Sequence, residues 1–471
     1  MIKLKRIKFL LQNNPPSSAG RRTMAGQRKK EKKMNLSATE FAQDLIRFVD
    51  ASPTPYHAIQ ETKRRLQEAG FQELKESERW FLKGRKYYAV RGGTSLIAFI
   101  IGSETPALYN GFKIVGAHTD SPNLKLKPNY AYTQTGYLQF GVEPYGGGVW
   151  RTWLDRDLHV AGRIVFRAPD GRLFSRLANM ENVTVSIPGL AIHLDREVNE
   201  NGAINNQTDL PAIVSLENVD SDTFNRWLLG PGLPADTKIV STALSLCDNQ
   251  NGTLSGFHNE FIRSGRLDDL ASCHQAITAL VNTEGSRETC VVSLCDHEEV
   301  GSGSAQGANG PFLKNTLERI AEMMGITNVS DFQRALSKSF CISSDMAHAA
   351  HPNHPRKEEP RHIIKIGGGP VIKWNADQRY ATTDVSAAIF ANVCDIAGVQ
   401  YQTFVSRSDA RCGSTIGPIT AKELGIPAVD VGIPMLAMHS IREQCGVNDH
   451  FAMEKAFETF FSREREEITE L

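Results

Sequence analysis

From residue 267 onward, the chain alternates short apolar runs with stretches of helical periodicity. The helical period is clearest at 267–280, where apolar side chains recur at the spacing of one helix face. The apolar runs have the length and composition of buried strands and lie at 290–295, 340–344, 401–406 and 427–433. Strands that alternate with helices favour an α/β fold, and we predict a mixed, largely parallel sheet sandwiched by helices.

The part of the chain before residue 120 predicts further elements of the same fold. Residues 36–75 predict two helices on either side of a turn at Pro53 and Pro55. Residues 86–101 predict a β-hairpin around a Gly-Gly turn, and 112–117 predict a buried strand.

Residues 130–250 have a different character, with three consecutive glycines at 146–148, Gly-containing turns and short alternating runs. No long helical period appears there, so this stretch predicts a mostly β insertion. We therefore divide the chain into a basic, disordered extension (1–35), a first catalytic segment (36–128), the β-rich insertion (129–255) and a second catalytic segment (256–471).

Charge separates the first residues from the rest of the chain. Residues 1–33 contain eleven Lys or Arg and one acid, Glu31, so they carry +10, and a net charge of zero overall leaves −10 elsewhere. An acidic body argues against a nucleic-acid-binding core, and no nucleic-acid partner is expected. The basic segment is interpreted as a disordered arm, as an extension upstream of a start at Met34, or as a transit-like segment.

Two further features concern the cellular environment. No apolar run approaches the roughly 18 residues that a membrane-spanning helix needs, so no membrane partner is expected. The eight cysteines are scattered and form no CxxC pair. This pattern is typical of reduced thiols in a cytosol-like compartment, and we expect a cytoplasmic protein.

Polar side chains follow the predicted strands at the points where the strands end. These residues are His118, Asp120, Glu298, Glu299, Asp345, His348 and His439. The helix at 267–280 opens with Asp268 and Asp269. Because ligands of open α/β sheets bind beyond the carboxyl ends of the strands, these groups could converge. Imidazole nitrogen and carboxylate oxygen together suit Zn²⁺, or Mn²⁺ or Co²⁺ in its place.

Each of these residues also has a plain structural explanation. A single His at a strand end is usually hydrogen-bonded structure, and Asp268 and Asp269 could simply cap a helix. The coincidence of several such groups at element ends favours a metal site. The adjacent pair Glu298 and Glu299 adds to this, because neighbouring side chains in a turn point different ways. One carboxylate could bind metal while the other takes a proton from water.

Seven motifs follow one another in the order of a known family, from about residue 38 to the end of the chain. They are VGAHTDSPNLKLKP, GRLDDLASC, CDHEEVGSGSAQGA, SSDMAHAAHPNHP, GPVIKWNADQRYA, CGSTIGPI and LAMHSIRE. On these motifs the sequence resembles the aspartyl aminopeptidase family of two-zinc metallopeptidases. The resemblance implies a zinc-peptidase-like α/β domain interrupted by a β-rich dimerisation domain. It also implies a homo-oligomer, typically a dodecamer built from dimers, with enclosed active sites.

The resemblance implies a role for each metal-site residue. Asp268 would bridge two divalent metal ions; the relatives often have Asn at the next position, and Asp269 here stays open as the alternative bridge. One metal would add Glu299 and His439, and the other His118 and Asp345. Glu298 would be the general base. Independently of the resemblance, Asp120 lies two residues after His118 and could hold the far ring nitrogen of that histidine.

The resemblance also implies residues that contact the substrate. His348 would contact the substrate or the developing oxyanion. His193 would reach into the active site of a neighbouring subunit. Lys373 and Tyr380 would line the substrate pocket, with the ammonium group of Lys373 as the partner of an acidic first side chain.

Together these features predict a metallo-aminopeptidase that removes N-terminal residues, preferentially Asp or Glu, from peptides. A metal-activated water would attack the first peptide carbonyl, with Glu298 as general base. One alternative is a related metal-dependent deacylase or carboxypeptidase, which would need a cation for the α-carboxylate of its substrate. Another is a non-catalytic assembly or cargo protein, which the intact set of ligands disfavours.

Overall fold

The computed structural model describes residues 36–104, 111–216, 221–234 and 236–463. The predicted basic extension at 1–35 lies outside the described residues. In the described part of the chain, no helix is both long enough and apolar enough to cross a membrane.

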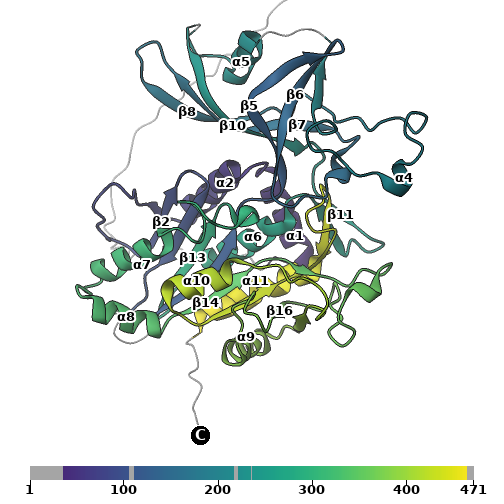
Figure 1. Ribbon diagram of the computed structural model, residues 1–471. Coiled ribbons are helices and arrows are strands. Elements are labelled where there is room, and N and C mark those ends of the chain that lie inside the picture. Colours follow the sequence, from purple (N-terminus) through teal and green to yellow (C-terminus); the bar gives the residue numbers. More distant parts are fainter. Residues whose placement is uncertain (1–35, 105–110, 217–220, 235, 464–471) are drawn as a thin grey trace, which may run out of the picture. The chain divides into compact units, whose positions relative to one another are not determined.

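A nine-stranded mixed sheet forms the centre of the α/β body (Figure 1). Its strands, in spatial order, are β1 (Gln72–Glu73), β2 (Lys86–Arg91), β3 (Ser95–Ile100), β13 (Thr289–Cys295), β4 (Phe112–His118), β14 (Phe340–Ser344), β18 (Ala428–Gly432), β16 (Val371–Trp374) and β17 (Gln402–Val405). The four central strands β13, β4, β14 and β18 run parallel. The carboxyl ends of these strands therefore lie at one edge of the sheet.

Helices cover both faces of this sheet. Successive residues of β4 show why: Val115 packs in one hydrophobic cluster and Ile114 in another, because side chains alternate across a strand. The first cluster includes residues of α1 (Ala38–Asp50), α2 (Pro55–Glu68), α6 (Leu267–Asn282), α9 (Asp384–Ala397) and α11 (Val447–Ser462). The second includes residues of α7 (Phe312–Met323), α8 (Val329–Ser337) and α10 (Ile416–Leu424). The predicted sandwich is confirmed.

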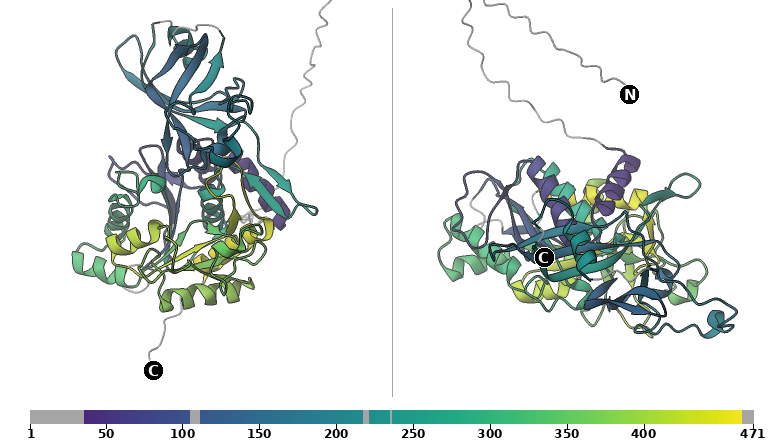
Figure 2. Two further views of the ribbon diagram at one scale, coloured as in Figure 1. Left: turned by 45° about the vertical axis from the view of Figure 1, so that its right-hand side comes forward. Right: turned by 90° about the horizontal axis from the view of Figure 1, so that it is seen from above.

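A second, antiparallel sheet of six strands has a hydrophobic core of its own. In spatial order it contains β8 (Leu173–Asn179), β7 (Leu158–Arg167), β10 (Lys238–Asp248), β5 (Asn123–Gln134), β6 (Tyr137–Tyr145) and β9 (Ala212–Ser215). Three short helical segments accompany it: η1 (Trp150–Trp153), α4 (Val198–Asn201) and α5 (Ser221–Leu229). In Figures 1 and 2 this sheet lies beside the α/β body, and β5 and β6 extend towards that body.

A third sheet of five short strands lies beside the end of the central sheet. It contains, in order, β11 (Thr253–Ser255), β12 (Phe261–Ser264), β20 (Glu443–Gly446), β19 (Pro434–Leu436) and β15 (Ala347–His348). Pairing of β15 with β19 holds the segment after β14 against the segment after β18. Two short 3₁₀ turns, η2 (Glu298–Val300) and η3 (Pro355–Lys357), complete the described elements.

Most of the predicted elements are present, with two differences. The run at 401–406 forms a strand, β17, but only Phe404 in it is buried, because β17 is the edge strand of the large sheet. Asp268 and Asp269 lie at the start of α6, yet both have non-helical backbone angles. Their carboxylates are therefore not simple helix caps, and both are buried.

Candidate metal centre

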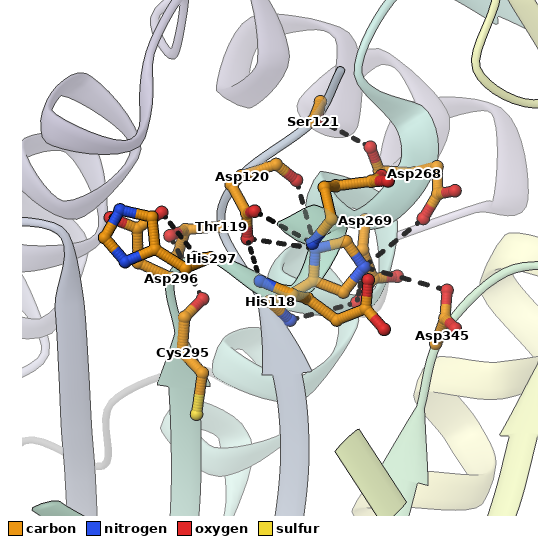
Figure 3. Close-up of polar contacts among 12 residues, drawn as sticks. His118, Thr119, Asp120, Ser121, Asp268, Asp269, Cys295, Asp296, His297 and Asp345 are labelled. Carbon is orange, nitrogen blue, oxygen red and sulfur yellow. Dashed lines mark hydrogen bonds and ion pairs between the residues drawn. The ribbon is translucent and has the colours of Figure 1, made fainter. Parts of the chain in front are cut away.

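Side chains from four strand or helix ends converge at the carboxyl edge of the large sheet. Figure 3 shows His118, Asp268 and Asp345 among them. His118 ends β4, Asp345 follows β14, Glu298 and Glu299 follow β13, and Asp268 begins α6. Their ligand atoms, with those of Asp269 and His439, fall into three overlapping groups, and within each group all atoms lie within 4.8 Å of one another. The parallel strands bring these residues together although up to 321 positions separate them in the sequence (439 minus 118).

The ring of His118 is fixed by its backbone surroundings. Its Nδ1 lies 3.0 Å from the carbonyl oxygen of Asp120. Since a carbonyl oxygen only accepts hydrogen bonds, Nδ1 carries the hydrogen and Nε2 of the neutral ring keeps its lone pair. This Nε2 lies 3.5 Å from Oδ1 of Asp268 and 3.8 Å from Oδ1 of Asp345.

His439 has the same arrangement on the other side of Asp268. Its Nδ1 lies 3.0 Å from the carbonyl oxygen of Gly147, so its Nε2 is also available. That Nε2 lies 3.2 Å from Oδ2 of Asp268 and 3.3 Å from Oε1 of Glu299. The two carboxylate oxygens of Asp268 therefore face two different imidazole rings.

Asp269 faces the interior rather than the second histidine. Its Oδ2 accepts a hydrogen bond of 3.1 Å from the backbone N–H of His118 and lies 4.0 Å from Nε2 of that ring. Its side chain is fully buried. Of the two neighbouring aspartates, only Asp268 has an oxygen near His439.

Asp120 holds the turn that carries the two glutamates. Its Oδ1 accepts from the backbone N–H of Glu298 and its Oδ2 from that of Glu299, both at 3.1 Å. Oδ2 also accepts a hydrogen bond of 2.6 Å from the hydroxyl of Tyr145. Asp120 Oδ1 also lies 3.5 Å from Nδ1 of His118, so this carboxylate contacts both the glutamate turn and the first imidazole.

The site concentrates negative charge away from water. Burial raises the pKa of Glu298 to about 8, and the nearby carboxylates of Asp345 and Glu299 add to this. Burial likewise raises the pKa of Glu299 to about 7 against the opposing contact with His439. Burial also disfavours the anion of Asp268, but contacts with His118 and His439 outweigh it, so the pKa of Asp268 is lowered. Such crowded carboxylates are stabilised by a cation.

The residues present fit a divalent metal ion. Oδ1 of Asp268 and Oε1 of Glu299 are buried and have no hydrogen-bond partner in the described part of the chain. Leaving a buried carboxylate oxygen unpaired is costly, and a metal ion would remove that cost. Imidazole Nε2 atoms together with carboxylate oxygens form a donor set that suits zinc.

An open pocket of about 220 Å³ lies beside this cluster and shares residues with it. Three residues that were predicted to contact the substrate in their own subunit line this pocket: His348, Lys373 and Tyr380. The Lys373 side chain is only 3% exposed, and its Nζ lies 3.4 Å from Oδ2 of Asp345 and 5.5 Å from the ring centre of Tyr380. His193 does not line the pocket; it is exposed in the segment between β8 and α4.

Two contributors to the site were missed in the sequence. Glu443 is buried and accepts hydrogen bonds from the backbone N–H groups of Asp268 at 3.1 Å and of His439 at 2.7 Å. It lies in the motif LAMHSIRE, four residues after the histidine, which was an available signal. Tyr145 was missed because it ends a strand of the separate antiparallel sheet, and its only signal was the run of three glycines that follows it.

The chain is similar to known proteins. Residues 48–461 match the family described as aminopeptidase I zinc metalloprotease (M18). The chain is also similar to a protein of Pseudomonas aeruginosa (strain UCBPP-PA14) named probable M18 family aminopeptidase 2. The two are 44% identical over 430 residues, which cover 90% of this chain and 98% of the relative.

Solved structures show the same fold. A chain in the cryo-EM structure of the Ape4 and Nbr1 complex has a TM-score of 0.86 at 40% identity, covering 90% of this chain and 86% of that one. A chain of the mApe1 dodecamer of S. cerevisiae has a TM-score of 0.78 at 29% identity, covering 90% and 96%. An M18 aminopeptidase from Thermotoga maritima, at 23% identity and a TM-score of 0.78, supports the fold alone.

Proposed function

The chain belongs to the M18 family of zinc metallo-aminopeptidases, as its motifs predicted, and we propose that it removes N-terminal Asp or Glu from peptides. The observation that carries the acidic preference is Lys373, a buried ammonium group on the wall of the pocket beside the metal centre. A neutral first side chain would leave this group without a substrate partner, whereas a carboxylate would pair with it.

We propose that each subunit binds two divalent metal ions and that these ions are zinc. Asp268 would be shared, because its two oxygens face different imidazole rings. Glu299 and His439 would complete one ligand set, and His118 and Asp345 the other. When bound, the metals supply an activated water and polarise the scissile carbonyl.

The protein's own groups would move the protons and hold the substrate. Glu298 would take a proton from the attacking water and deliver it to the leaving amine. Asp120 accepts hydrogen bonds from the backbone N–H groups of Glu298 and Glu299. These bonds would keep the carboxylate of Glu298 beside that of the ligand Glu299. His348, on the pocket wall, would donate to the oxygen that becomes negatively charged.

A panel of peptides that differ only in the first residue tests this function. We expect kcat/KM for peptides beginning with Asp or Glu to exceed that for Ala or Leu by at least about tenfold. Dialysis against a chelator should remove the activity, and Zn²⁺, Mn²⁺ or Co²⁺ should restore it. An N-acetylated Asp peptide is the control and should not be cleaved.

Three results would contradict parts of this proposal. Equal rates on all first residues would contradict the acidic preference. Release of C-terminal residues would indicate the carboxypeptidase alternative. Full activity of metal-free protein would contradict the metal mechanism.

We further propose that the chain forms a homo-oligomer, as the mApe1 dodecamer does, through the insertion at 129–255 between the catalytic segments 36–128 and 256–471. Around His193, the side chains of Leu190, Ile192 and Leu194 are 62%, 47% and 75% exposed. Such an exposed apolar loop is typical of a protein interface. Contact with a second copy would cover it and bring His193 to the neighbour's pocket.

Light scattering during gel filtration should therefore give a mass far above the 52.0 kDa of one chain. His193→Ala should keep that mass while lowering kcat/KM, because the residue would complete a site in another subunit. A fully active monomer would contradict both the assembly and the role of His193.

A cytoplasmic location is also proposed. All eight cysteines lie in the described part of the chain and are free thiols. Free thiols are typical of a reducing compartment.

A further inference from the structure

The segment formed by residues 145–149 links the antiparallel sheet to the metal centre. It begins at Tyr145, the last residue of β6, and runs to Val149 just before η1. Although it belongs to the antiparallel sheet and the turn that follows it, it contacts Asp120, Glu299 and His439 of the α/β body. We call it the 145–149 segment.

Tyr145 is connected to the turn that carries Glu298 and Glu299 through the carboxylate of Asp120. Its ring is 9% exposed, and its hydroxyl donates to Oδ2 of Asp120 at 2.6 Å. The same carboxylate accepts the backbone N–H groups of Glu298 and Glu299. Lys125, from the neighbouring strand β5, lies over the Tyr145 ring with its Nζ 3.7 Å from the ring centre. A hydroxyl from the antiparallel sheet therefore contacts the carboxylate that holds the glutamate turn.

Two further residues of the segment, Gly147 and Val149, contact His439. The carbonyl oxygen of Gly147 accepts from Nδ1 of His439 at 3.0 Å, and the backbone N–H of Val149 donates to the carbonyl oxygen of His439 at 2.9 Å. These two bonds fix both the ring and the backbone of that histidine. A ring held at Nδ1 in this way presents Nε2 to a metal.

Gly146 brings the segment close to Glu299. Its φ of +73° lies in the left-handed region, and a Cβ placed on it would come within 3.1 Å of the Glu299 Cβ. Both observations require glycine here. A side chain at this position would push against a residue whose carboxylate faces His439.

We propose that the 145–149 segment positions the metal centre, and that Tyr145 is the positioning residue that holds the Glu298–Glu299 turn through Asp120. This inference rests on the proposed function, because it assigns the segment a role in that metal site. It also makes the geometry of the centre depend on the β-rich insertion and not on the α/β body alone.

Tyr145→Phe removes one hydroxyl and tests the role directly. Tyr137→Phe is the matched control, because it makes the same change at the other end of β6, where the side chain is 41% exposed. We expect Tyr145→Phe to lower kcat by about 10- to 100-fold with KM changed less than about threefold. The control should retain wild-type kcat and KM.

A metal-binding readout separates positioning from simple destabilisation. Metal-free protein should be titrated with Co²⁺ alone, without peptide, and its visible absorption spectrum recorded. Tyr145→Phe should change that spectrum or weaken Co²⁺ binding about 10- to 100-fold, with a Tm close to that of the control. A spectrum, affinity and kcat equal to those of Tyr137→Phe would overturn the proposal, and so would a lowered Tm with unchanged kcat.

A second pair of variants approaches the same centre through Gly146. Gly146→Ala should weaken Co²⁺ binding because its methyl group meets Glu299. Gly136→Ala is its control: it has a similar φ of +84° in the β5–β6 turn but nothing within 4 Å of an added Cβ. Equal Co²⁺ affinity in these two variants would contradict the role of the segment. If wild-type protein bound no Co²⁺ and cleaved no peptide, the proposed function itself would fail instead.

Discussion

Glu298→Gln should leave the protein folded and able to bind its metals, yet slow peptide cleavage by about 100- to 10,000-fold. Glutamine has nearly the same shape as glutamate but cannot accept the proton of the attacking water. The backbone N–H of residue 298 would still donate to Asp120, so the turn would keep its geometry. Metal content per subunit and kcat, measured on the same preparation, test this expectation.

Glu299→Gln is the matched control, since it makes the same chemical change one residue later. Oε1 of Glu299 lies 3.3 Å from Nε2 of His439, in the group of ligand atoms that includes Asp268. We expect this variant to lose metal as well as activity. Equal metal loss in both variants would mean that the division of labour between the neighbouring glutamates is wrong. Normal activity of Glu298→Gln would remove Glu298 from the mechanism.

Much of the α/β body could be predicted from local sequence. The hairpin of β2 and β3, the helices α1 and α2, and the buried strands β4, β13, β14 and β18 each carry their own period or apolar run. Burial on both faces makes the central strands continuous apolar runs. The position of β17 at the sheet edge could not be predicted, because spatial strand order is a tertiary property that no local pattern encodes.

The candidate metal-site residues could be predicted from the sequence because of where the strands end. Parallel strands end at one edge of a sheet, so polar groups such as His118 and Asp345 at strand ends are expected to meet. Residues that orient these ligands gave weaker signals. Glu443 supports Asp268 from 175 positions away, and Tyr145 acts from a different sheet. Only the folded chain shows such contacts, because they depend on how the sheets and loops pack.

The environment of Lys373 determines how its role can be tested. Its ammonium group is buried 3.4 Å from Oδ2 of Asp345, which is itself a proposed metal ligand. Removing the charge will therefore affect Asp345 for every substrate. Only an additional loss confined to acidic substrates reports on selectivity, so each variant must be assayed on paired peptides.

Lys373→Met should lower kcat/KM for an N-terminal Asp peptide much more than for the matching Ala peptide. An acidic side chain that enters the pocket loses its water, and a buried charge left unpaired costs about 3–5 kcal/mol. That cost corresponds to a factor of hundreds or more in the ratio of the two rates. Lys373→Arg keeps the positive charge and should retain part of the acidic preference. If both peptides lose the same factor in Lys373→Met, with metal content unchanged, Lys373 supports Asp345 and does not select the substrate.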